Sequence, residues 1–257
     1  MISDASCEEC AKITTRFERD IARGFWGDAR TSYDAPSRRK KKRNQYVYLD
    51  DQYKPGNKLK IPFNEYPAPM VFYEMNTAGF LLGQPESVDH SSNWKFKAIV
   101  DQTKLEKFEK KYPGQLTAKI LFNHDSFARL IAKIGYGQIM CSLDPGDFRP
   151  ICLPYILGEK PILSYIVGSR KNIPEPKPDI GYVMSSISYG TSKYLVLIAE
   201  IRIIANNHTP VYHVVVGDVS GKENVHYVRE KLIATYEVVI PDNTSSVQSL
   251  SDPHKYS

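Results

Sequence analysis

Two cysteines near the start of the chain, Cys7 and Cys10, are separated by two residues. This spacing lets two thiolates approach one metal ion from a tight turn. A structural zinc ion takes four ligands, and no second Cys or His pair lies nearby in the sequence. The pair therefore predicts half of a structural zinc site, with redox chemistry or a chance pairing as the alternatives.

The remaining cysteines, Cys141 and Cys152, are expected to be buried structural thiols. Cys141 falls on the apolar stripe of an expected helix, and Cys152 lies between two aliphatic residues. The N-terminal residues show no secretory signal, and no apolar run approaches the roughly 20 residues that cross a bilayer. We therefore expect a cytoplasmic protein with reduced thiols rather than a disulfide framework.

A run of six basic residues contributes more positive charge than the net +5 of the whole chain. Such a block can bind phosphate backbones by releasing counterions, and the nearby Tyr46 and Tyr48 are candidate base or sugar contacts. A solvated linker without a partner is the alternative. The predicted nucleic-acid-binding residues are Arg38, Arg39, Lys40, Lys41, Lys42 and Arg43.

The histidines give weaker signals. His208 and His213 flank an expected hairpin loop and Asp218 follows, so a surface metal site is conceivable, but turn and strand positions are the simpler interpretation. His124 and Asp125 are more simply a loop and a helix cap than a catalytic dyad. Glu200 and Arg202 are interpreted as two charges on an edge strand, because an arginine cannot replace the lysine of a magnesium nuclease core.

The hydrophobic pattern indicates an α+β fold. Apolar residues recur at helical spacing from Cys10 to Phe25 and from Asp125 to Leu143, with Asp125 as the expected cap of the second helix. Short strands are expected at 46–49, 70–73, 80–82 and 94–100, and the final third is β-rich with antiparallel hairpins. We divide the chain into a partial zinc-knuckle segment and helix (1–27), a basic linker (28–45), an α+β body (46–240) and a disordered tail (241–257).

Four segments together resemble a group of bacterial HNH endonuclease-like proteins over about residues 2–217. Residues 2–14 with Phe17 and Glu18 resemble the second zinc knuckle of that group, and 35–40 resemble the basic stretch that follows it. Residues 127–134, with 147–150 and 157–158 downstream, and the segment 209–217 resemble later parts.

The resemblance implies a ββα-metal motif that cleaves DNA. In that motif a histidine activates water, a divalent metal such as magnesium stabilises the scissile phosphate, and zinc is structural. This chain has no histidine before His90, and Ala11 stands where many such proteins place His or Asn. We therefore expect no cleavage by the chain as given, because residues upstream are missing or the motif is degenerate. A non-catalytic module that binds nucleic acid or protein, with a vestigial knuckle, is the alternative.

Overall fold

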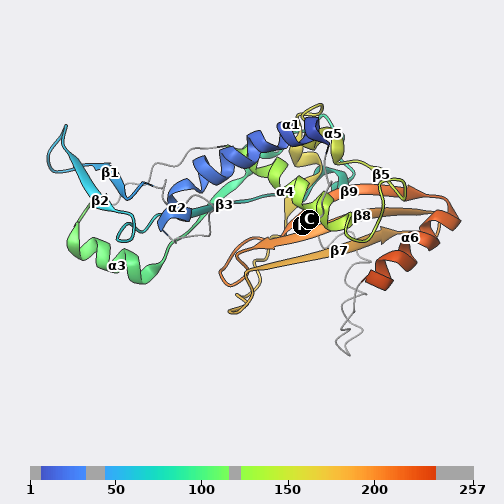
Figure 1. Ribbon diagram of the computed structural model, residues 1–257. Helices are drawn as coiled ribbons and strands as arrows, with labels where there is room; N and C mark the ends of the chain where they lie inside the picture. Colours follow the sequence, from blue (N-terminus) through green and yellow to red (C-terminus); the bar gives the residue numbers. More distant parts are fainter. Residues whose placement is uncertain (1–6, 33–43, 116–122, 236–257) are drawn as a thin grey trace.

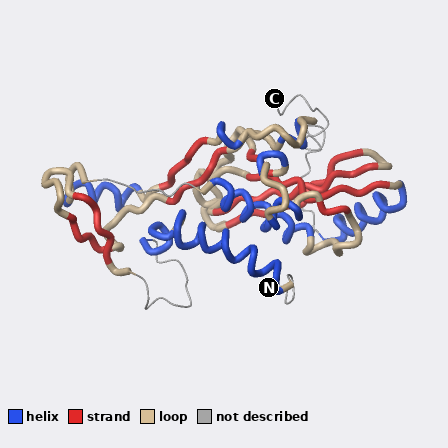
Figure 2. Tube along the Cα trace, turned by 90° about the horizontal axis from the view of Figure 1, so that it is seen from above, coloured by secondary structure: helices blue, strands red, loops and turns tan. Residues whose placement is uncertain are grey.

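The computed structural model describes residues 7–32, 44–115 and 123–235. These residues form a large body and a smaller lobe at one end of an elongated molecule (Figures 1 and 2). The body is built on an antiparallel sheet covered by helices, and the lobe consists of a hairpin and one helix. The expected α+β class is confirmed.

The N-terminal helical segment packs into the core of the body. It comprises α1 (Glu8–Arg19), the π-helical turn η1 (Asp20–Phe25) and α2 (Gly27–Ser32). Phe17, Ile21 and Phe25 repeat at four-residue spacing, are buried, and belong to the same core as the body sheet. The helix expected within residues 1–27 is therefore held against the body, and only its far end reaches the lobe (Figure 1).

The body sheet has the strand order β5-β9-β8-β7, and β6 also pairs with β9. All of these pairings are antiparallel. Strands β8 and β9 form the hairpin expected around residues 206–210. They are antiparallel, and the first pair after the loop is Ile201 opposite Tyr212. The strands are β5 (Arg149–Pro150), β6 (Val167–Ser169), β7 (Tyr182–Gly190), β8 (Tyr194–Ile203) and β9 (Tyr212–Ser220).

Helices α4 (His124–Ile139) and α6 (Lys222–Thr235) pack on the body sheet, and the short helix α5 (Leu153–Leu157) packs on α4 and α1. A Cβ built on Gly135 would lie 2.8 Å from the Cβ of Val214, so α4 approaches β9 too closely for a larger residue. The cap of α4 is Asn123, whose side chain accepts the N–H of Ser126, and not Asp125 as expected.

The lobe comprises β1 (Tyr46–Asp50), β2 (Lys58–Pro62) and α3 (Gln102–Lys111). Its own small core includes Leu49, Ile61 and Phe108. The antiparallel pair β3 (Met70–Glu74) and β4 (Lys95–Ile99) connects the lobe to the body. The described residues also include three short 3-10 turns: η3 (Gly79–Leu82), η4 (Ser91–Asn93) and η5 (Leu163–Tyr165). The strand expected at 80–82 is wrong, because η3 occupies it.

Candidate nucleic-acid interface

The β1–β2 hairpin presents one apolar face and one face of aromatic and charged residues. Because side chains alternate along a strand, Leu49 and Ile61 point into the lobe core while their neighbours point outward. Tyr46 is 38% exposed and Tyr48 59% exposed, and Tyr48 lies opposite Lys60 in the register. We call this outward surface the ribbon face; its residues are Tyr46, Tyr48, Asp50, Lys58 and Lys60.

The tyrosines and lysines of the ribbon face lie close together. The Lys60 ammonium group is 4.0 Å from the centre of the Tyr46 ring, within the range of a cation–π contact. Lys58 lies opposite Asp50 at the turn end of the hairpin. The sequence reasoning found Tyr46 and Tyr48 but missed Lys58 and Lys60. The alternating pattern Lys-Leu-Lys-Ile at residues 58–61 could have revealed them, because it is typical of a half-buried strand.

The six residues of the basic run, 38–43, lie outside the described residues. The described residues on both sides of that segment belong to or contact the lobe. Before it, the Ser32 hydroxyl donates to the carbonyl of Tyr66 and the Lys104 ammonium group donates to the carbonyl of Ser32 at 2.7 Å. After it, the chain enters β1 at Tyr46. The segment that contains the basic run therefore lies, in the sequence, between a residue that contacts the lobe and a strand of the lobe.

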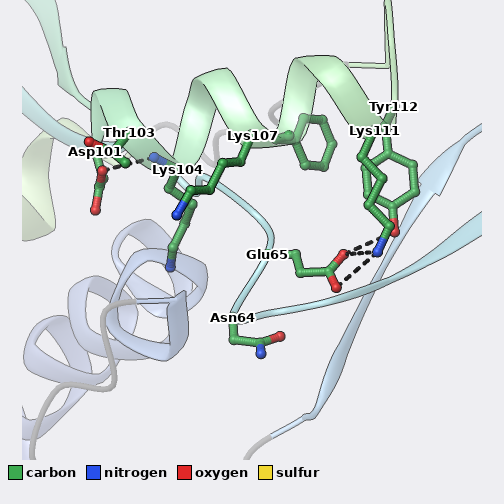
Figure 3. A pocket seen from close by; sticks show the side chains of 9 residues that line it. Asn64, Glu65, Asp101, Thr103, Lys104, Lys107, Lys111 and Tyr112 are labelled. Atoms are coloured by element: carbon green, nitrogen blue, oxygen red, sulfur yellow. Dashed lines mark hydrogen bonds and ion pairs between the residues drawn. The ribbon is translucent and has the colours of Figure 1, made fainter.

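A cavity of about 400 Å³ lies beside α3, between this helix and the loop at Asn64 and Glu65 (Figure 3). Lys111 and Glu65 form an ion pair at 2.8 Å on its rim, and this hydrogen bond lowers the pKa of Glu65. Burial lowers the pKa of Lys104, which also bonds to Ser32. Lys107 lines the same cavity and adds a further cation to this side of the lobe.

The predicted zinc ligands lie far from the lobe, at the opposite end of the N-terminal helical segment (Figure 1). The Cys7 sulfur caps α1 by accepting the Cys10 N–H at 3.3 Å. A hydrogen bond between the two cysteine side chains lowers the pKa of the Cys7 thiol and raises the pKa of the Cys10 thiol. Within 7–32, 44–115 and 123–235, no group of three or more His, Cys, Asp or Glu side chains is placed to hold a metal ion.

The two other thiols differ from each other. Cys152 is buried, as expected, and burial raises its pKa to about 12. Cys141 is exposed, so the prediction of a buried thiol is wrong. The physical reason is that α4 ends at Ile139, which places Cys141 in the following turn, where its thiol bonds to the carbonyl of Gly137.

The histidines expected at turn and strand positions take structural roles. His213 is buried on β9, and its Nε2 accepts the N–H of Ala78 at 3.0 Å. Asp218 accepts hydrogen bonds from the Arg149 guanidinium group and from the Tyr194 hydroxyl at 2.9 Å. His208 lies exposed in the hairpin loop. His213 therefore joins the sheet to the segment at Ala78, Asp218 joins β9 to β5 and β8, and the two side chains make separate structural contacts.

Glu200 and Arg202 lie on β8, which is a central strand of the sheet, so the expectation of an edge strand is wrong. Glu200 pairs with Arg170. The Arg202 guanidinium group is buried and donates to the backbone carbonyls of Pro174 and Glu175. The Glu200 and Arg202 side chains therefore bind the segment that contains Arg170, Pro174 and Glu175 to strand β8.

The burial of His213 gives a testable pH dependence. Burial, with the Arg170 charge as a lesser cause, lowers the pKa of His213 from 6.5 to about 4. As the pH falls through 6.5 the unfolded chain binds a proton that the folded chain does not, so stability is lost between pH 6.5 and 4. Protonation of this histidine in the unfolded chain should lower the free energy of unfolding by about 3 kcal/mol between pH 6.5 and pH 4. Urea unfolding of the wild type and His213→Gln at several pH values measures the difference, and equal pH dependence of the two would contradict it.

Comparison with known proteins adds no relative. No family model matches the chain, and no curated protein or solved structure matches it. No helix of the described ranges is both long enough and apolar enough to span a membrane.

Proposed function

We propose that this chain is the DNA-binding body of an HNH-type, metal-dependent endonuclease-like protein, and that the chain as given binds DNA without cleaving it. The observation that carries the proposal is the ribbon face, with two exposed tyrosines and two lysines on a hairpin. The six-residue basic run lies in the sequence between Ser32, which contacts the lobe, and strand β1 of the lobe. Two exposed tyrosines and two lysines therefore share one face of the lobe, and the basic run precedes this hairpin in the sequence.

This arrangement suits a nucleic acid for physical reasons. A two-stranded ribbon is narrow enough to enter the major groove of duplex DNA. Lysine and arginine side chains contact phosphates, and each contact releases counterions into the solvent. Tyrosine rings can pack against sugars or stack on unpaired bases. Because the other face of the hairpin is packed on Phe108 and its neighbours, the ribbon is held rigid for such contacts.

The nuclease part of the proposal rests on the family resemblance. Cys7 and Cys10 would supply two of the four ligands of a structural zinc ion, and both sulfurs lie at an accessible helix start. A complete member would add a histidine base and a catalytic metal such as magnesium. We place the protein in the cytoplasm, where such thiols stay reduced. A non-catalytic module with a vestigial knuckle remains the second candidate, because the Cys7 sulfur already has a role as a helix cap.

Truncating one ribbon tyrosine tests the proposed DNA surface. The Tyr48→Ala variant is expected to bind single-stranded DNA about 5- to 160-fold more weakly, since stacking of one base on an aromatic side chain is worth about 1–3 kcal/mol. Tyr227→Ala is the matched control, because Tyr227 is 47% exposed on α6 in the body. Fluorescence anisotropy of labelled DNA measures both affinities.

Equal binding by Tyr48→Ala and the wild type would reject the ribbon face as the DNA surface. The cleavage part of the proposal has its own readout. Supercoiled plasmid incubated with the chain and magnesium or manganese should stay intact. Nicking or linearisation that disappears with a chelator would show that this chain is itself a nuclease, whatever the binding result.

A further inference from the structure

The N-terminal helical segment carries four basic residues on its outer surface. Lys12, Arg16 and Arg19 lie on α1, Arg23 lies on η1, and all four are exposed. Steps of four, three and four residues place them on one stripe, because residues three or four apart are neighbours on a helix surface. This stripe lies opposite the side that buries Ile21 in the core. We call these four basic residues the helix stripe.

The side chains of the helix stripe are available to an external anion. In the part of the chain that the structure describes, none of the four forms a hydrogen bond or an ion pair. The acidic residues nearby are engaged elsewhere: Glu18 pairs with Lys133 on α4, and Asp20 accepts a hydrogen bond from Ser126. The other two acidic residues of α1 stand in its first turn, where they interact favourably with the helix dipole.

The spacing and chemistry of the helix stripe suit a polymer of phosphates. At the rise of an α-helix, Lys12 and Arg23 are about 16 Å apart along the axis. A DNA duplex presents about nine phosphates over that length, enough for each of the four cations to reach one. Three of the four are arginines, whose planar guanidinium group can donate two hydrogen bonds to one phosphate.

An anionic membrane is a poorer match for the same stripe. A helix that lies on a membrane buries an apolar face in the lipid beside its basic residues. The apolar face of this segment, with Phe17, Ile21 and Phe25, is already buried in the body core. Within the described residues 7–32, no large apolar side chain is exposed. The stripe therefore offers charge without an apolar face, as a phosphate backbone requires.

We propose that the helix stripe is a second phosphate-binding surface, which contacts the backbone of duplex DNA along the N-terminal helical segment. The inference rests on the proposed DNA binding and extends it from the lobe to the body. The segment ends at Ser32, whose hydroxyl donates to Tyr66 of the lobe. The stripe therefore lies on the segment that leads from the lobe toward Cys7 (Figure 1).

A variant with all four stripe residues replaced by glutamine tests the inference. If all four contact phosphates, the slope of log affinity against log salt concentration should fall by about 3 to 4 with one labelled duplex. The matched control removes the same charge from other exposed positions and should leave the slope nearly unchanged. Its substitutions are Lys171→Gln, Lys177→Gln, Lys193→Gln and Lys222→Gln. Fluorescence anisotropy measures the slopes, and circular dichroism establishes that both variants are folded.

A variant with glutamine at residues 38–43, measured in the same series, separates this inference from the proposed function. If it lowers the slope while the folded stripe variant keeps the slope of the wild type, DNA binding stands and the helix stripe is rejected. If only the stripe variant lowers the slope, the stripe is supported and the basic run makes no phosphate contacts. A wild-type chain that does not bind duplex DNA at low salt rejects both.

A membrane partner has a separate readout. Sedimentation with vesicles of phosphatidylserine and phosphatidylcholine compares the wild type with the stripe variant. An unchanged DNA slope, together with weaker sedimentation of the stripe variant, would overturn the inference and assign the stripe to an anionic membrane.

Discussion

Replacing all six residues of the basic run, Arg38 to Arg43, by glutamine is expected to remove most of the affinity of the chain for duplex DNA. Each phosphate contact contributes about 0.9 to the slope of log affinity against log salt concentration. If all six residues contact phosphates, the slope should fall by about five in the variant. Fluorescence anisotropy with one labelled duplex at several salt concentrations measures both slopes.

The matched control removes positive charge from the body instead. Lys171 and Lys222 are exposed and lie away from the lobe, so Lys171→Gln with Lys222→Gln should leave the slope nearly unchanged. If the six-residue variant and the control have the same slope as the wild type, the basic run makes no phosphate contacts. It would then be a solvated linker, and any remaining binding would have to come from the ribbon face or from another surface.

The Ile21→Ala variant is expected to lower the free energy of unfolding of the whole body by about 2–5 kcal/mol. Ile21 is fully buried in η1, and its side chain belongs to the same core as the sheet strands and α4. Truncation would leave a cavity between the N-terminal helical segment and the body. Urea unfolding followed by circular dichroism measures the loss.

Ile233→Ala removes the same atoms from a side chain that is 68% exposed on α6, and should change stability by less than about 0.5 kcal/mol. A large loss in Ile21→Ala alone shows that the N-terminal helical segment is part of the cooperative body. If both substitutions have equal and small effects, this segment folds as a separate knuckle. The boundary that the sequence analysis places after residue 27 implies that result.

Periodic segments were predictable from the sequence, but their ends were less so. The stripe Phe17, Ile21 and Phe25 identified the N-terminal helix and its buried face, because four-residue spacing follows the turn of a helix. The same pattern located α4, yet its cap is Asn123 and it ends at Ile139, since capping is decided by local backbone geometry. Helix α6 was missed, because it continues directly from the strand-rich region and has only a thin apolar stripe.

The candidate site was predictable only in part. The basic run and the tyrosines beside it are visible as residue types and positions. That Lys58 and Lys60 share a face with Tyr46 and Tyr48 depends on the register of β1 and β2, which the sequence alone leaves open. Long-range contacts were also hidden. The bond from Ala78 to His213 joins distant parts of the chain, and it turns a possible metal ligand into a buried structural histidine.

Hydrogen exchange of the full chain with and without duplex DNA, at low salt, tests the central claim most directly. The account expects slower exchange of backbone amides in peptides that cover residues 44–62, which contain β1 and β2, and little change across β8 and β9 in the body. DNA that protects the body while residues 44–62 exchange as in the free chain would contradict the ribbon face as the binding surface. Unchanged exchange across the whole chain with DNA present in excess would contradict it as well.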